Sequence, residues 1–220
     1  MYGLDCHRCQ RGFCLTCKKL DRSHGRLINL LRRARQIPGV KKVFVRSGIR
    51  YDLALSSPEY VRELVNHHVS GLLKIAPEHV SPKVLQLMNK SGVQVEKFRQ
   101  LFKKLTGNRK QHLKYYFMVA HPGTTMKEAE ELAAFIKKLE AEGEKPVEGV
   151  QIFTPTPMTR STCMYYTGRD PETGQPVYVP RTFEEKKAQK RLLQKYSSAI
   201  SSTARQKFRK IKKIRDDKNR

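Results

Sequence analysis

The feature that most constrains the fold is an alternation between short apolar runs and longer stretches with helical spacing. The apolar runs, rich in β-branched and aromatic residues, span 41–46, 71–76, 113–120 and 147–153. Apolar residues recur at helical spacing over 25–36, 58–67, 81–89, 95–105 and 125–140. Because the connections are long enough for crossovers, the pattern predicts an α/β fold, with a four-stranded parallel sheet or part of a (βα) barrel.

The amino-acid composition changes after residue 153. The stretch 154–180 is rich in Pro, Thr and Gly, and a charged helical segment begins at residue 182. We therefore predict four regions: a cysteine-rich segment (1–24), a partial barrel (25–155), a loop layer with a helix (156–196) and a basic tail (197–220).

The net charge of +25 is concentrated at the two ends of the chain. Residues 1–50 hold 13 Lys and Arg against 2 Asp and Glu, and residues 181–220 hold 15 against 4, whereas residues 51–180 hold 17 against 14. Basic ends suit a phosphate-rich partner such as RNA, although solvated helix faces give the same pattern. No apolar run is long enough to span a membrane and no signal core opens the chain, which favours a cytoplasmic protein.

Polar residues or Gly/Pro turns follow each predicted strand. Ligands of parallel α/β sheets bind beyond the carboxyl ends of the strands, so we expect a single site at one rim. The candidate ligand-binding residues are Arg50, Asp52, Lys74, Glu78, His121, Gly123 and Thr154. In the segment HPGTT (121–125), Gly123 allows close approach of the backbone to a ligand, and the next residues begin a helix. The free amides of a helix start suit an anionic or polar group, although a strand-to-helix turn without a ligand would have the same sequence pattern.

Four of the five cysteines fall within twelve residues. Cys6, Cys9, Cys14 and Cys17 form two CxxC pairs four residues apart. Paired thiolates indicate a metal, and we predict zinc or an iron–sulfur cluster here; unligated thiols are the alternative.

Several longer segments resemble one known family. The segments SGIRYDLAL (47–55), LLKIAPEHVSPKVLQLMNK (72–90), FMVAHPGTT (117–125) and FTPTPMTRSTCMYYTGRDP (153–171), in this order, are similar to the YgiQ-type radical S-adenosylmethionine (SAM) family. The likeness covers about residues 1–196.

The resemblance implies a (βα) barrel that binds SAM and a 4Fe–4S cluster held by a CxxxCxxC loop. The chain contains no CxxxCxxC. We therefore expect a C-terminal fragment of such an enzyme, which is inactive alone and whose partner is the missing N-terminal half of the barrel. The alternative is a basic metal-binding module that binds RNA without catalysis.

Overall fold

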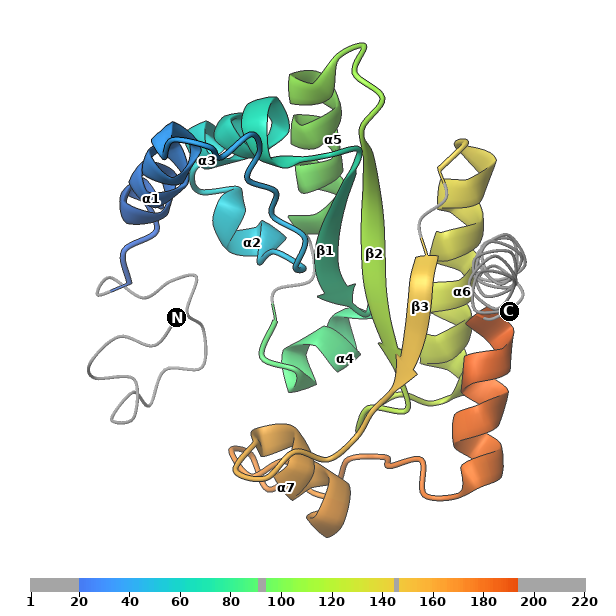
Figure 1. Cartoon of the computed structure of the whole chain (residues 1–220). Coiled ribbons are helices and arrows are strands. Elements are labelled where there is room, and N and C mark those ends of the chain that lie inside the picture. The colour runs from blue at the N-terminus through green and yellow to red at the C-terminus, as the bar shows by residue number, and fades with distance from the viewer. Residues whose placement is uncertain (1–19, 91–93, 145–146, 194–220) are drawn as a thin grey trace, which may run out of the picture.

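The structure is a computed structural model that describes residues 20–90, 94–144 and 147–193. Figure 1 shows the arrangement of these elements. The elements, in chain order, are α1 (Gly25–Gln36), α2 (Tyr51–Ala54), α3 (Pro58–Glu63), the π-helical turn η3 (Leu64–His68), β1 (Leu72–Glu78), α4 (Pro82–Leu87), α5 (Gln94–Thr106), β2 (His112–Val119), α6 (Met126–Ala141), β3 (Val147–Ile152) and α7 (Arg160–Thr167). A further helix covers 183–193. None of the helices in these ranges has both the length and the apolar composition of a membrane span.

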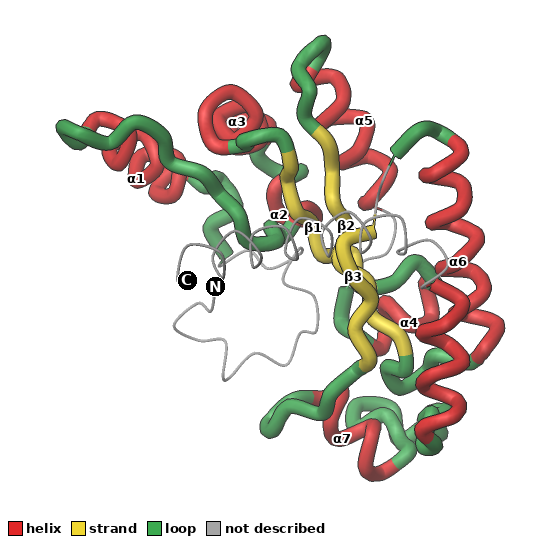
Figure 2. Tube along the Cα trace, turned by 45° about the vertical axis from the view of Figure 1, so that its right-hand side comes forward, coloured by secondary structure: helices red, strands yellow, loops and turns green. Residues whose placement is uncertain are grey.

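The described strands form one parallel sheet in the order β1-β2-β3. On one face of β2, Leu113, Tyr115 and Phe117 are buried; on the other face Tyr116 is exposed while Lys114 is buried. The buried apolar set shares one core with Phe98 of α5 and with residues of α6, and both helices lie beside the strands (Figures 1 and 2). One sheet face is thus covered by helices, and the α/β prediction is confirmed with three strands.

The predicted strand at 41–46 does not form. Its basic residues and Phe44 are exposed. Its backbone bonds to His68 alone among the described residues: the Val45 N–H donates to His68 O at 3.0 Å, and Val43 O accepts from His68 Nδ1 at 2.7 Å. The segment reaches the sheet later, through a single parallel bridge between Ile49 and Ile75. A run of β-branched residues favours an extended backbone, but a strand forms only where that backbone also pairs with the edge strand of a sheet. The prediction of a fourth strand is therefore wrong for residues 41–46.

The longest helix, α6, begins at a capping box. The Thr125 side chain accepts from the Lys127 N–H, and the Glu128 carboxylate accepts from the Thr125 N–H at 2.8 Å and from its hydroxyl. These bonds satisfy amides that would otherwise lack partners at a helix start. They fix the helix start directly after the turn that leaves β2.

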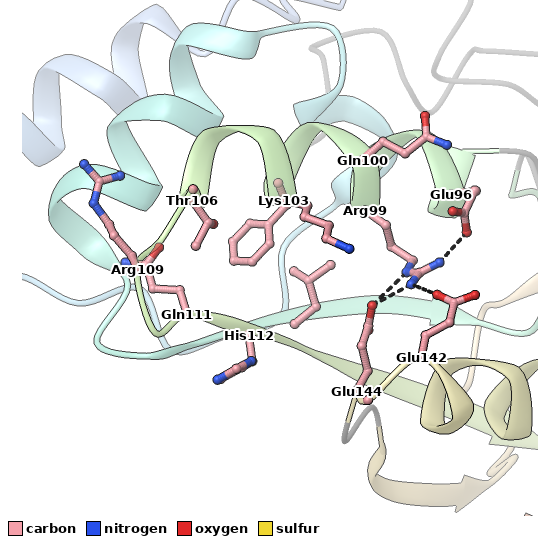
Figure 3. A pocket seen from close by; sticks show the side chains of 14 residues that line it. Glu96, Arg99, Gln100, Lys103, Thr106, Arg109, Gln111, His112, Glu142 and Glu144 are labelled. Atoms are coloured by element: carbon pink, nitrogen blue, oxygen red, sulfur yellow. Dashed lines mark hydrogen bonds and ion pairs between the residues drawn. The ribbon is translucent and has the colours of Figure 1, made fainter.

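A cavity of about 410 Å³ lies at the amino end of β2, between α5 and the α6–β3 turn (Figure 3). Its wall holds Arg99, which pairs with Glu96 at 2.6 Å, Glu142 at 2.5 Å and Glu144 at 2.6 Å. The Tyr115 hydroxyl also donates to Glu144 at 3.0 Å. This ion-pair cluster ties α5 to the α6–β3 turn, at the end of the sheet opposite the predicted site.

Replacing Arg99 with Met should lower the free energy of unfolding by about 2–3 kcal/mol, because three carboxylates would then face one another without a counter-charge. The loss stays below that of a fully buried pair, since Glu96 and Glu142 are partly exposed. Urea denaturation at pH 7.5 measures the change. The exposed Lys103 lines the same cavity, so Lys103→Met is the control and should shift stability by less than about 0.5 kcal/mol.

Candidate functional site

The turns that follow the three strands leave the sheet at one edge, because the strands are parallel. Figure 1 shows α4 and α7 at this carboxyl edge, beyond the arrowheads of the strands. The register pairs Val119 of β2 with Ile152 of β3, so His121 and Thr154 each stand two residues beyond a paired position. The chain therefore brings Glu78, His121, Gly123 and Thr154 to the edge where the sequence predicted a site.

The first turn begins at Glu78, whose φ of +68° bends the chain away from β1. Its carboxylate is paired with Lys90, which lies beyond α4, at 2.8 Å, and the same ammonium donates to Ala76 O at 3.0 Å. Lys90 therefore holds the end of β1 and fixes the carboxylate of Glu78 at the rim.

His79 follows at once and is fully buried. Its Nδ1 accepts a hydrogen bond from the Ser81 N–H at 3.0 Å, so the proton of the neutral ring sits on Nε2. That Nε2 has no hydrogen-bond partner among the described residues. Burial, and then the nearby ring of His121, lower the pKa of His79 to about 4, so the ring is neutral at pH 7.

His121 is also buried, in the turn after β2. Its Nδ1 donates to Pro122 O at 2.7 Å, because a carbonyl can only accept, and its bare Nε2 accepts from the Ser161 hydroxyl of α7 at 2.7 Å. Burial lowers the pKa of His121 to about 4, against the opposing effect of Pro122 O. Its ring also packs edge-on against Phe153, with centroids 5.0 Å apart. Both ring nitrogens of His121 are thus engaged within the protein.

The same turn requires glycine at position 123. Gly123 has φ +91°, and a Cβ at this position would lie 2.3 Å from Leu87 Cδ1 of α4. Its N–H donates to Tyr178 O at 2.7 Å. The next residue, Thr124, is fully buried, and its hydroxyl has no partner among the described residues. The turn therefore packs tightly on α4 while leaving one buried hydroxyl unsatisfied.

The other predicted site residues are Arg50 and Asp52 before the sheet, Lys74 within β1, and Thr154 in the turn after β3. Arg50, which directly precedes α2, donates two hydrogen bonds of 2.8 Å and 2.6 Å to the carboxylate of Asp52 within α2. Lys74 stands inside β1, in register with Lys114, and its carbonyl accepts from the Ile49 N–H. Thr154 is exposed, and its hydroxyl donates to Ile152 O at 3.4 Å. Their participation in one cavity remains a prediction.

A second cavity, of about 260 Å³, opens beside Gly123. It lies between α4, which contributes Lys83 and Leu87, and the segment 170–178 that follows α7. Asp170 anchors that segment by accepting two 2.8 Å bonds from Arg160. Burial raises the pKa of Asp170, but the bonds from the Glu172 N–H and Arg160 outweigh it and lower the pKa.

The predicted metal ligands Cys6, Cys9, Cys14 and Cys17 lie outside the described residues. Among residues 20–90, 94–144 and 147–193, no group of three His, Cys, Asp or Glu side chains could hold a metal ion. The metal site of the cysteine-rich segment stays a prediction.

Sequence reasoning missed several residues that shape this edge. Ser161 contacts His121 across forty positions, and Gln189 contacts Ala120 and Thr124 across more than sixty. His79 carried a local signal, since it lies beside Glu78, three residues beyond the predicted strand 71–76. The others stand in segments read as a loop layer and a charged helix, where spacing gives no sign of a contact with β2.

The chain is similar to proteins of several archaea and bacteria. The chain is 45% identical over 208 residues to a protein of Methanocella arvoryzae, and 47% identical over 207 residues to one of Geobacter sulfurreducens. A Clostridium perfringens protein is 44% identical over 194 residues. Each of these three relatives is a UPF0313 protein. A family model described as a domain of unknown function, DUF3362, matches residues 148–207.

The UPF0313 relatives are longer than this chain. The match to the Methanocella arvoryzae protein covers 88% of the chain but 34% of that protein, and the Geobacter sulfurreducens match covers 33% of its protein. The matched part is the C-terminal portion of these proteins. The chain thus spans about a third of the length of the UPF0313 relatives, as expected for part of a larger protein.

Proposed function

We propose that this chain is the C-terminal part of a radical SAM iron–sulfur enzyme of the YgiQ type, and that its carboxyl edge binds part of SAM. The observation that carries the proposal is a pair of buried polar groups, His79 Nε2–H and the Thr124 hydroxyl, that have no hydrogen-bond partner in the described part of the chain. They lie in the turns after two adjacent parallel strands. An unsatisfied buried polar atom costs about 1–3 kcal/mol, so two of them at the usual ligand-binding edge favour a ligand.

The donor set fits SAM. The His79 Nε2–H can donate to a carboxylate, a hydroxyl or a ring nitrogen, and the Thr124 hydroxyl can both donate and accept. The Glu78 carboxylate can accept from ribose hydroxyls, while Lys90 limits its movement. Bound to a 4Fe–4S cluster, SAM supplies radical chemistry through one-electron cleavage. The cluster itself does not fit this chain, because the 220 residues contain no CxxxCxxC.

The residues around the turns act by orienting and excluding water. His121 is neutral, and its two ring nitrogens bond to Pro122 O and to the Ser161 hydroxyl. These bonds fix the shape of the turn and keep the ring proton on Nδ1. Phe153 and Tyr165 pack in sequence behind His121, with ring centroids 5.9 Å apart. These ring contacts connect the turn after β2 to α7, on which Tyr165 lies.

Replacing Thr124 with Val tests the proposal, because Val has the same shape and removes only the hydroxyl. The variant should be as stable as the wild type or more stable by about 1 kcal/mol, since a buried unpaired group is lost. Its affinity for SAM, measured by equilibrium dialysis, should fall by about tenfold, the equivalent of one hydrogen bond.

Thr106→Val is the matched control. Thr106 is also buried with an unpartnered hydroxyl, but it lines the cavity at the opposite, amino end of the sheet. This variant should show the same gain in stability and unchanged SAM binding. Equal SAM binding by wild type and Thr124→Val, or loss in both variants, would contradict the assignment of Thr124 to the ligand site.

The alternative of an RNA-binding module finds less support in the arrangement of the basic N-terminal helix. On α1, Arg32 pairs with Glu59 and Glu63 of α3, and Arg35 also pairs with Glu63 at 3.0 Å. These two arginines dock α1 onto α3, which leaves the exposed Arg26 and Arg33 as the arginines of α1 that face solvent. The enzyme proposal is therefore preferred.

A further inference from the structure

The turn that joins β2 to α6, residues 120–124, is held by three contacts from the C-terminal region. The Ser161 hydroxyl of α7 donates to His121 Nε2 at 2.7 Å. The Gly123 N–H donates to Tyr178 O at 2.7 Å. The third contact comes from Gln189 in the helix 183–193, which Figure 1 shows lying beside α6.

Gln189 holds both ends of the turn. Its Oε1 accepts from the Ala120 N–H at 2.8 Å, and its Nε2 donates to Thr124 O at 2.8 Å. The side chain is fully buried. A carboxamide is the side chain that offers an acceptor and a donor from one rigid plane, so a single residue satisfies both backbone groups.

The backbone of the turn needs such support. Ala120 has φ +59°, a left-handed conformation that costs a residue with a Cβ about 1 kcal/mol, and Gly123 has φ +91°. Within the turn, one backbone bond joins the Thr124 N–H to His121 O at 2.9 Å. An amide or carbonyl left without a partner here would favour a different path of the chain, so contacts from outside the turn select this path.

We infer that residues 160–193, within the region matched by the domain of unknown function, are a positioning element that clamps the turn 120–124 in its ligand-binding conformation. Ser161, Tyr178 and Gln189 all fall within the matched range. The clamp fixes where His121 and Thr124 stand relative to His79. The inference about the turn stands on the contacts alone; its consequence for SAM rests on the proposed function.

The test replaces Gln189 with Met, which has a similar volume and neither hydrogen-bonding group. Amide hydrogen exchange of the 220-residue chain is followed over residues 118–126. Exchange at Ala120 should speed up about tenfold or more, as expected for losing a buried hydrogen bond in a locally opening segment. SAM affinity should fall by about tenfold or more, because the binding-competent conformation of the turn becomes less populated.

Leu193→Ala is the matched control. Leu193 lies on the same helix and is fully buried in the core, but it makes no hydrogen bond to the turn. It should lower global stability and accelerate exchange across the core, without a selective effect at Ala120 or on SAM affinity at a temperature where the variant is folded. Unchanged exchange at Ala120 in Gln189→Met, or the same selective pattern in Leu193→Ala, would overturn the clamp.

The two proposals fail in different ways. If the wild-type chain binds no SAM, the ligand assignment fails, and the exchange of Ala120 still decides whether Gln189 clamps the turn. If the wild type binds SAM and Gln189→Met accelerates exchange without weakening binding, the clamp exists but does not position the ligand site, and the inferred role is wrong.

Discussion

Reconstituted anaerobically with iron and sulfide and supplied with reductant and SAM, this chain should form no 5′-deoxyadenosine above the protein-free blank. Reductive cleavage needs an electron from a cluster that also chelates SAM, and protein side chains cannot supply one. The sequence has no CxxxCxxC, and the pairs at Cys6, Cys9, Cys14 and Cys17 have a different spacing. Chromatographic detection of 5′-deoxyadenosine measures the outcome.

A full-length UPF0313 protein, such as that of Geobacter sulfurreducens, is the positive control in the same assay. Under the proposed function the full-length protein forms 5′-deoxyadenosine, and this chain does not. Repeated turnover by the chain alone would mean that the Cys6–Cys17 cluster generates the radical, and the assignment of this chain to the cluster-free part would be wrong. Absence of product from the full-length protein as well would count against the radical SAM proposal itself.

The parts of the fold that follow from local pattern were predictable. The strands at 72–78, 112–119 and 147–152 and the helix α6 lie within a few residues of their predicted bounds, because each carries its own apolar periodicity and start signal. The parallel order then placed His121 and Thr154 at one edge. The segment 41–46 has the composition of a strand, yet whether it pairs depends on the edge of β1, which the sequence does not encode locally.

The contacts that complete the candidate site were beyond sequence reasoning for a related cause. Gln189 belongs to a charged helix whose periodicity explains the burial of Leu193 but not the burial of an amide. Its partners are backbone groups of a turn in an unusual conformation, and the pattern of side chains says nothing about which backbone groups lack a partner. The short helices α2 and α7 were missed because four and eight residues give too little periodicity to read.

Lowering the pH from 7.5 to 5.5 should reduce the free energy of unfolding by about 3 kcal/mol through His79 and His121 alone. Both rings have a folded pKa of about 4, against an ordinary value of 6.5. Below pH 6.5 the unfolded chain therefore binds two protons that the folded chain does not, so stability falls as the pH falls. Each histidine contributes about 1.4 kcal/mol over this interval, and the loss continues until the folded rings protonate near pH 4.

Urea denaturation at pH 7.5 and 5.5 measures how the free energy of unfolding depends on pH. Substitutions then show how much of that dependence each histidine contributes. His79→Asn keeps an acceptor for the Ser81 N–H, and His121→Gln keeps an acceptor for the Ser161 hydroxyl, but neither replacement can take up a proton. Each single variant should lose about 1.4 kcal/mol of the pH dependence, whatever it does to stability at pH 7.5. Burial also lowers the pKa of His67, so this residue adds a slope of the same sign that every variant keeps.

Protonation of the carboxylates contributes little to this pH dependence, because it lowers the free energy of unfolding at lower pH. Burial raises the pKa of Glu128, but its bonds with Thr125 and Lys83 outweigh it and lower the pKa to about 2. The stability that this group contributes is present above its ordinary value of 4.5 and is lost only as the pH falls from there toward 2. A double variant of His79 and His121 that keeps the full slope between pH 7.5 and 5.5 would show that the two rings are not buried in their neutral form, and would remove the unsatisfied His79 Nε2–H from the argument for a ligand at this edge.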